Sequence, residues 1–120
     1  MTFMTAERAA LAETVRDFTA DQIAPSLDLW EREGELPRDL HKQAAALGLL
    51  GVGYPEEVGG SGGDLGDVIV VTESVLAAGG SGGVIAGLFT HGIAIPHIID
   101  SGNEDLIDAW VRPVLAGEKI

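Results

Sequence analysis

The sequence predicts an all-α fold, a bundle of about five to six helices joined by glycine-rich loops. Three observations lead to this prediction. Apolar residues recur at intervals of three and four along most of the chain, which is the spacing of one face of an α-helix. Glycine and proline residues, which interrupt regular structure, lie between these periodic stretches. The stretch Gly83–Asp100 is apolar on nearly every side, which is typical of a helix that others surround.

The first third of the chain predicts three helices. The first begins at Thr5 and breaks or bends at Pro25, because proline lacks the helical N–H. A shorter piece follows and ends at Gly34, and a third helix has Pro37 in its first turn and ends at Gly48. Their inner faces are expected to comprise Leu11, Val15 and Phe18, then Leu27 and Trp30, then Leu40, Ala44 and Leu47. His41 lies outside this stripe, so we expect it to be a solvated surface residue.

A loop and three further helices are predicted after Gly48. The segment Leu49–Asp64 is a loop, because seven glycines lie between Gly48 and Gly63. Asp64 is expected to cap a helix that extends to Ala78. The last helix follows Asn103, and its buried face is predicted to comprise Leu106, Ile107, Trp110, Val111, Val114 and Leu115.

The stretch Gly83–Asp100 is predicted to be the central helix of the bundle. Its length lies near the lower limit for a membrane span, but its two histidines, its proline and its three glycines argue against that interpretation. Pro96 is expected to kink the helix at a cost of about 3 kcal/mol, and Gly102 is expected to end it. Around the axis, a small face of Gly87, Thr90, His91 and Ala94 opposes a bulkier face of Ile85, Leu88, Phe89, Gly92 and Pro96.

The composition excludes several classes of partner. Against 19 Asp and Glu there are 7 Lys and Arg, a net charge of −12 that repels nucleic acid and anionic lipid. The same charge argues against these residues being the main contact of a polyanionic cofactor. Without cysteine there is neither a disulfide framework nor a thiolate metal site. The chain does not open on a signal peptide pattern, so we expect a cytoplasmic protein.

No residue stands out as catalytic, cofactor-binding or metal-ligating. The glycine clusters match neither the dinucleotide-binding fingerprint nor the P-loop. His91 and His97 are six residues apart and therefore face different sides of a helix; we interpret His91 as a buried, hydrogen-bonded residue. Glu73 lies among aliphatic residues, where it is either a base with a raised pKa or, more simply, the partner of a structural group.

Several motifs in a fixed order resemble the N-terminal domain of the acyl-CoA dehydrogenases, over nearly all 120 residues. They are Ile23-Ala24-Pro25, Leu36-Pro37, Leu47-Gly48-Leu49-Leu50-Gly51, the loop from Pro55 to Gly63, Glu73, Gly102-Asn103-Glu104-Asp105, and Trp110, Pro113 and Gly117-Glu118-Lys119-Ile120. On this resemblance, residues 1–120 form one helical domain of a longer protein. A β-domain and a C-terminal helical domain are expected outside this chain.

The resemblance also implies an activity. The expected protein is an FAD-dependent oxidoreductase of fatty acid β-oxidation that desaturates a fatty acyl-CoA thioester and passes electrons to an electron-transfer flavoprotein. Its catalytic glutamate and most of its flavin contacts would lie outside this chain, so these residues alone would be inactive. A tetramer is the usual assembly. Acyl-CoA oxidases and flavin monooxygenases on the same scaffold are alternatives, and so is a stand-alone helical interaction module.

The resemblance places an acyl-chain cavity against the central helix. Anchoring the family pattern on Gly102 assigns Ala86, Phe89, Thr90 and Ile93 to the cavity wall, and this is the register that we prefer. Anchoring it on Pro96 instead assigns Ile85, Leu88, Phe89 and Gly92. Simple packing of the helix core is the alternative role for any one of these side chains.

Overall fold

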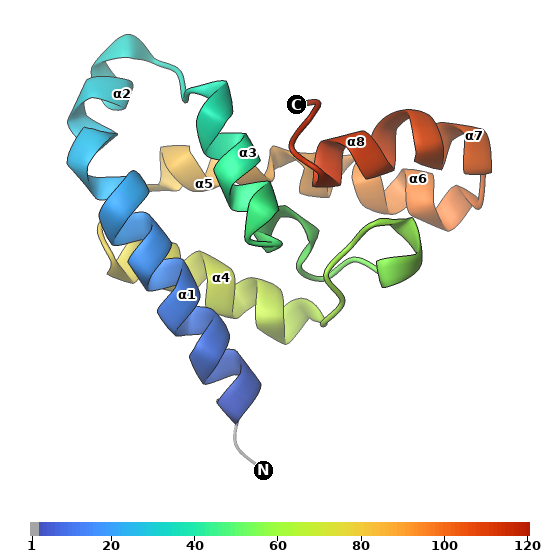
Figure 1. Ribbon diagram of the computed structural model, residues 1–120, viewed down its shortest axis with the longest axis horizontal. Helices are drawn as coiled ribbons and strands as arrows, with labels where there is room; N and C mark the ends of the chain where they lie inside the picture. Colours follow the sequence, from blue (N-terminus) through green and yellow to red (C-terminus); the bar gives the residue numbers. More distant parts are fainter. Residues whose placement is uncertain (1–2) are drawn as a thin grey trace.

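A computed structural model describes residues 3–120 of the chain, and these residues are helical throughout with connecting loops (Figure 1). The all-α prediction is confirmed. The α-helices are α1 (Ala6–Gln22), α2 (Leu27–Glu33), α3 (Arg38–Ala46), α4 (Leu65–Ala77), α5 (Gly82–Phe89), α6 (Ile95–Ser101), α7 (Glu104–Leu106) and α8 (Arg112–Leu115). A 3₁₀ turn (Ala24–Ser26) precedes α2, another (Thr90–Ile93) joins α5 to α6, and a π-turn (Ile107–Val111) joins α7 to α8.

Helix boundaries follow the capping residues that the sequence indicated. Asp64 caps α4 in a reciprocal capping box with Asp67, and the Asn103 side chain accepts a hydrogen bond from the backbone at the start of α7. Gly34 and Gly102 end α2 and α6 in the left-handed conformation, with φ of 76° and 68°. Pro37 lies one residue earlier than predicted, at the N-cap of α3.

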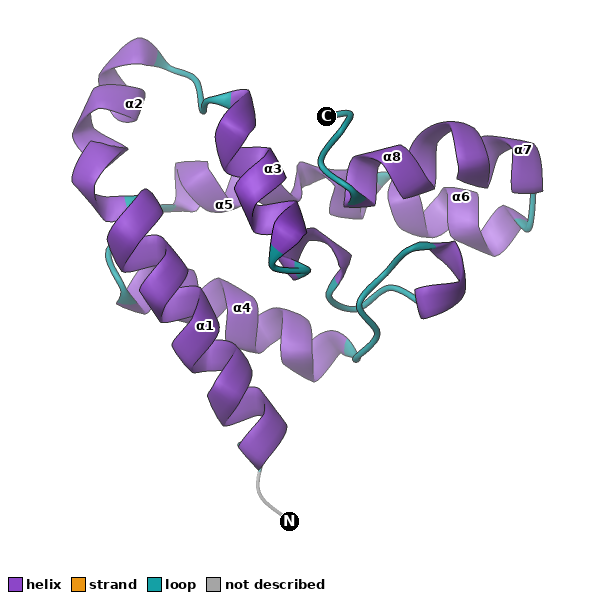
Figure 2. Ribbon diagram, viewed as in Figure 1, coloured by secondary structure: helices purple, strands orange, loops and turns teal. Residues whose placement is uncertain are grey.

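Two hydrophobic cores hold the chain together. In the larger core, α1 packs across α4, and α3 and α5 close the other sides (Figure 1). In the smaller core, α6 lies beside the α7–α8 segment as a helical hairpin (Figure 2). The larger core comprises Val15, Phe18, Ile23, Leu40, Ala44, Leu49, Leu50, Val71, Val75, Val84 and Leu88; the smaller comprises Val58, Ile95, Ile107, Val111, Val114 and Leu115.

The loop before α4 is more ordered than its glycine content predicts. Short 3₁₀ turns form at Leu49–Gly51 and Glu56–Val58. The loop folds back on itself, because the Gly53 amide donates to the Gly62 carbonyl oxygen at 2.9 Å. Leu49 and Leu50, the apolar residues with which the loop begins, are buried.

The central apolar stretch differs most from its prediction. It is not one helix: the 3₁₀ turn Thr90–Ile93 separates α5 from α6. Pro96 therefore lies in the first turn of α6, where its missing N–H costs little, and the expected penalty does not arise. The expectation of burial on every side is also wrong, since Val84, Leu88 and Ile95 are buried whereas Ile93 is 77% exposed.

The segment Gly82–Ser101 has the length and hydropathy of a candidate membrane span. Its mean hydropathy is 1.5 over the most apolar window, and 17% of that window is buried within the domain. One such segment is weak evidence for a span, because these criteria use length and composition alone.

The buried face of the last helical segment is narrower than predicted. Ile107, Val111, Val114 and Leu115 are buried, but Leu106 is 42% exposed and Trp110 50% exposed. The reason is that α6 covers only one side of this segment. Leu106 and Trp110 lie on its other side and line an open cleft.

Burial predicts a clear contrast between two residues of the central stretch. Leu88→Ala should lower the free energy of unfolding by about 2 to 5 kcal/mol, because it leaves a cavity in the larger core. Ile93→Ala, which removes an exposed side chain, should change it by less than about 0.5 kcal/mol. Urea denaturation followed by circular dichroism measures both. Equal losses in the two variants would contradict the assignment of Leu88 to the core.

Candidate functional site

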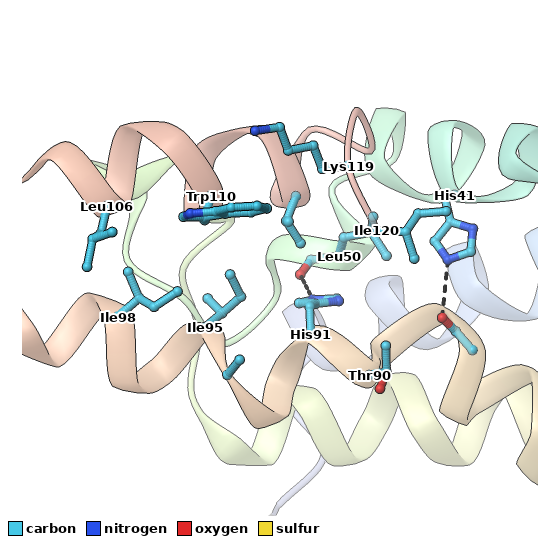
Figure 3. Close-up of a pocket in the computed structure, with 13 residues that line it drawn as sticks. His41, Leu50, Thr90, His91, Ile95, Ile98, Leu106, Trp110, Lys119 and Ile120 are labelled. Carbon is cyan, nitrogen blue, oxygen red and sulfur yellow. Dashed lines mark hydrogen bonds between the residues drawn. The ribbon is translucent and has the colours of Figure 1, made fainter.

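An apolar cleft of about 390 Å³ lies between the central stretch and the C-terminal segment (Figure 3). One wall comes from α5, the 3₁₀ turn and α6, and the other from the π-turn, α8 and the last two residues. The cleft is lined by His41, Leu50, Gly87, Thr90, His91, Ala94, Ile95, Ile98, Leu106, Trp110, Val114, Lys119 and Ile120. Such an apolar hollow with a few polar groups is typical of a small-molecule site.

The small face of the central stretch forms part of the cleft wall. Gly87, Thr90, His91 and Ala94, which the helical spacing grouped together, all line the cleft. Gly87, Thr90 and Ala94 are small, and Leu or Phe at these positions would fill part of the cleft. The small face that the helical spacing indicates therefore marks the location of the cleft.

The four residues assigned to the acyl cavity lie in different surroundings. Ala86 and Thr90 are exposed and border a second hollow between the α2–α3 region and α5, and Thr90 also lines the main cleft. Ile93 is exposed and lines none of the three described hollows. Phe89 instead packs against the larger core and lines a small hollow of about 100 Å³ with Tyr54.

The alternative register contains more core residues. Leu88 is 1% exposed and belongs to the larger core, and Ile85 packs against that core. Gly92 lines the small hollow with Phe89. Ala86, Thr90 and Ile93 of the preferred register are the ones whose side chains remain uncovered within the described residues.

Two histidines connect the central stretch to the elements on its inner side. The Nε2 atom of His91 lies 2.9 Å from the Leu50 carbonyl oxygen, and Nε2 of His41 lies 3.1 Å from the Gly87 carbonyl oxygen (Figure 3). His41 is 6% exposed, so the prediction that it is a solvated surface residue is wrong. The apolar spacing of α3 did not predict the burial of His41, because its partner is a backbone carbonyl of α5 and side-chain periodicity does not reveal such a partner.

The environment of His91 disfavours its charged form. Burial lowers the pKa of the imidazole, the nearby His41 lowers it further, and the hydrogen bond to Leu50 acts in the opposite direction. The rings of Tyr54 and Phe89 lie 5.9 Å and 6.4 Å from the His91 ring, centroid to centroid. The predicted hydrogen bond of His91 is present, but the residue is half-buried rather than buried, and its ring forms part of the cleft wall.

Trp110 and Lys119 form the rim of the cleft, and neither role was predicted. Lys119 Nζ lies 4.5 Å from the centre of the Trp110 ring and donates a hydrogen bond to the Ala109 carbonyl oxygen. This arrangement holds Trp110 flat along the cleft, as Figure 3 shows. The spacing of the sequence predicts only an apolar stripe here, because the turn that returns Lys119 to Trp110 is a tertiary feature.

The other sequence candidates remain outside this site. Glu73 is exposed, and none of the described ion pairs involves it, so a buried base and a structural ion pair both lack support. His97 is exposed on α6. The glycine loop packs on its own backbone, where a Cβ at Gly51 would lie 2.9 Å from the Ser61 nitrogen. Within residues 3–120 no group of three or more histidines and acids could hold a metal.

The residues that line the three described hollows do not fit the phosphate groups of FAD. Of the side chains that line the cleft and the two other hollows, Lys119 is the one fixed cation, and Glu31 and Glu35 line the second hollow. The loop glycines turn inward rather than forming a ring of free amides. A flavin would therefore need other segments for its pyrophosphate.

The fold is that of a helical domain with an apolar cleft. A family model described as "Acyl-CoA dehydrogenase, N-terminal domain" matches residues 5–118. The chain therefore belongs to the acyl-CoA dehydrogenase family and corresponds to the N-terminal helical domain of that family.

Known relatives agree with this assignment. A crystal structure of a probable acyl-CoA dehydrogenase from Mycobacterium abscessus ATCC 19977 / DSM 44196 is 58% identical, with a TM-score of 0.97, over 99% of this chain and 32% of that one. A probable acyl-CoA dehydrogenase of Bacillus subtilis (strain 168) is 40% identical over 68% of this chain and 21% of that protein. The mitochondrial long-chain specific acyl-CoA dehydrogenase of Sus scrofa is 33% identical over 95% of this chain and 26% of that protein. The chain thus spans at most a third of the length of these relatives.

The lowered pKa of His91 predicts a pH-dependent stability. Below about pH 6.5 the unfolded chain takes up a proton on this residue that the folded protein resists, so stability should fall as the pH decreases toward the folded pKa. His91→Gln keeps an N–H that can donate to Leu50 but does not titrate, so its stability should vary less between pH 7 and pH 5. Thermal denaturation across this range measures the difference.

His97→Gln is the matched control, because this histidine is exposed on the same stretch. It should keep the pH dependence of the unsubstituted protein. If His91→Gln also kept it unchanged, the neutral state of His91 would make no contribution to stability.

Proposed function

We propose that this chain is the N-terminal part of an FAD-dependent acyl-CoA dehydrogenase and contributes one wall of its acyl-chain cavity. The reaction would be α,β-desaturation of a fatty acyl-CoA thioester. The observation that carries this proposal is the uncovered side of the central stretch, where Ala86, Thr90 and Ile93 are exposed and Thr90 lines the apolar cleft. Membership of the family supplies the reaction class.

The uncovered side of the central stretch is expected to contact another surface. Ile93 is 77% exposed, and on the neighbouring α4 Leu65 is 73% and Ile69 42% exposed. Contiguous apolar surface in water is unfavourable, and in soluble proteins it usually marks a site of contact. A hydrocarbon chain held between this face and another domain would remove both surfaces from water, at about 25 cal/mol for each Å² of apolar area.

The remaining machinery would lie outside residues 1–120. FAD, when bound, would accept a hydride from the substrate, and its phosphates would be held by other parts of the longer protein. A glutamate beyond this chain would remove the α-proton. These residues alone should therefore be inactive. Electrons would pass to an electron-transfer flavoprotein, and the whole protein would be a homotetramer. A cytoplasmic location remains a prediction from the sequence.

The longer protein that contains this chain is expected to purify yellow and to reduce an artificial electron-accepting dye with fatty acyl-CoA. Absorbance spectra and a dye-reduction assay over several chain lengths measure this. A colourless protein that is inactive on every chain length would overturn the proposal and favour a helical interaction module. Oxygen consumption with hydrogen peroxide release would instead indicate an acyl-CoA oxidase, and oxygenated product a flavin monooxygenase.

Substitution of Thr90 tests the proposed cavity wall. Thr90→Phe adds a ring at the edge of the cleft and should shift the chain-length preference toward shorter acyl groups, while the flavin content stays the same. The ratio of kcat/KM for long and short acyl-CoA substrates measures the shift. Thr14→Phe, on the exposed face of α1, is the matched control and should leave the ratio unchanged. An unaltered profile for Thr90→Phe would remove Thr90 from the cavity.

A further inference from the structure

The cleft and the small hollow beside Phe89 adjoin at a shared wall. The two spaces have Leu50 and His91 in common among their lining residues and otherwise differ. The cleft has a volume of about 390 Å³ and the small hollow about 100 Å³. Leu50 belongs to the larger core, whereas His91 lies on the 3₁₀ turn and belongs to neither core. The His91 side chain is therefore the part of the wall that a substitution can remove without opening a core.

Contacts on several sides hold the His91 ring in this wall. The Leu50 carbonyl oxygen can only accept a hydrogen bond, so Nε2 of His91 donates to it at 2.9 Å (Figure 3). The rings of Tyr54 and Phe89, which line the small hollow, lie 5.9 Å and 6.4 Å from the His91 ring, centroid to centroid. These distances are typical of aromatic pairs in contact. The ring therefore has little freedom to move out of the wall.

The small hollow suits a short piece of hydrocarbon. Its lining is mainly aliphatic and aromatic, and none of its lining residues carries a fixed charge. Pockets that hold a whole small molecule have volumes of about 300 to 1,000 Å³, so this hollow is too small for one. It can instead hold one end of a molecule whose remainder lies in an adjoining space. The apolar lining residues are Leu49, Leu50, Val52, Val68, Val71 and Phe89.

We propose that His91 sets the upper limit of acyl-chain length by closing the small hollow off from the cleft. This inference rests on the proposed function, since it requires an acyl chain in the cleft. His91 is then a specificity-determining residue whose removal acts in the opposite direction to Thr90→Phe. A chain that passes the position of the ring would place its last carbon atoms against Phe89 and Val71.

Turnover of a homologous series of acyl-CoA thioesters by the longer protein, with its flavin bound, tests the inference. His91→Ala should move the maximum of kcat/KM toward longer chains by about three carbon atoms, taking each methylene group to occupy about 30 Å³, close to the volume of one water molecule. For chains that extend into the small hollow, kcat/KM should rise about fourfold for each methylene group that is newly removed from water.

Further variants assign the effect to the ring and to the small hollow. His91→Phe keeps a ring in the wall and should keep the chain-length maximum of the unsubstituted protein. Thr72 lines the small hollow but not the cleft, so Thr72→Phe combined with His91→Ala fills the hollow and should restore the shorter maximum. His97→Ala, at an exposed position of α6, is the matched control and should leave the maximum unchanged.

His91→Asn is a second test of the same wall for the case in which His91→Ala does not fold. It removes part of the ring but keeps a polar side chain, and it should shift the maximum in the same direction. Flavin absorbance and circular dichroism show which variants are folded and loaded.

Failure of this inference differs from failure of the proposed function. If folded His91→Ala and His91→Asn proteins turn over thioesters with the unsubstituted profile, the role of His91 alone is wrong. A longer preference that persists after Thr72→Phe fills the hollow would also overturn it, since the added carbon atoms would lie elsewhere. A longer protein that turns over no thioester would overturn the proposed function, and with it the acyl chain on which this inference rests.

Discussion

Two hydrogen bonds from histidine rings to backbone carbonyls organise this domain. His41 of α3 binds the Gly87 carbonyl of α5, and His91 of the 3₁₀ turn binds the Leu50 carbonyl. Gly87 lies in the last turn of α5, where carbonyls lose their intrahelical donors. The ring of His41 supplies one such donor. These two hydrogen bonds connect the interrupted apolar stretch to α3 and to the glycine loop. The interruption therefore has tertiary contacts as well as local ones.

The cleft follows from this interruption. Because the 3₁₀ turn ends α5, a separate helix, α6, begins at Ile95. α6 packs against the α7–α8 segment, whereas α5 belongs to the larger core. The space between the two cores is bordered by small residues on one side and by Trp110 on the other. Gly87 also permits close packing, because a Cβ there would lie 2.6 Å from the Leu36 side chain. Two separate cores, joined at a turn, leave an apolar hollow between them.

The helices and their boundaries were largely predictable, because capping is local. Asp64, Asn103, Gly34 and Gly102 act within one turn of the residues that they cap, and the structure agrees with each. The site was less predictable. The small face of the central stretch was visible in its spacing, but the burial of His41 and the exposure of Trp110 were not. Both depend on neighbours that are distant in the sequence.

The sequence by itself determined the all-α class, the family and the acidic character of this domain, since composition, caps and ordered motifs are properties of the chain alone. Only the tertiary structure decided which apolar residues are covered. Amphipathic spacing identifies a face but not the element that meets it, and Leu106 and Ile107 belong to the same predicted stripe with opposite outcomes. The central stretch is apolar all round, yet packing covers only part of it, and the apolar cleft lies along this partly covered stretch.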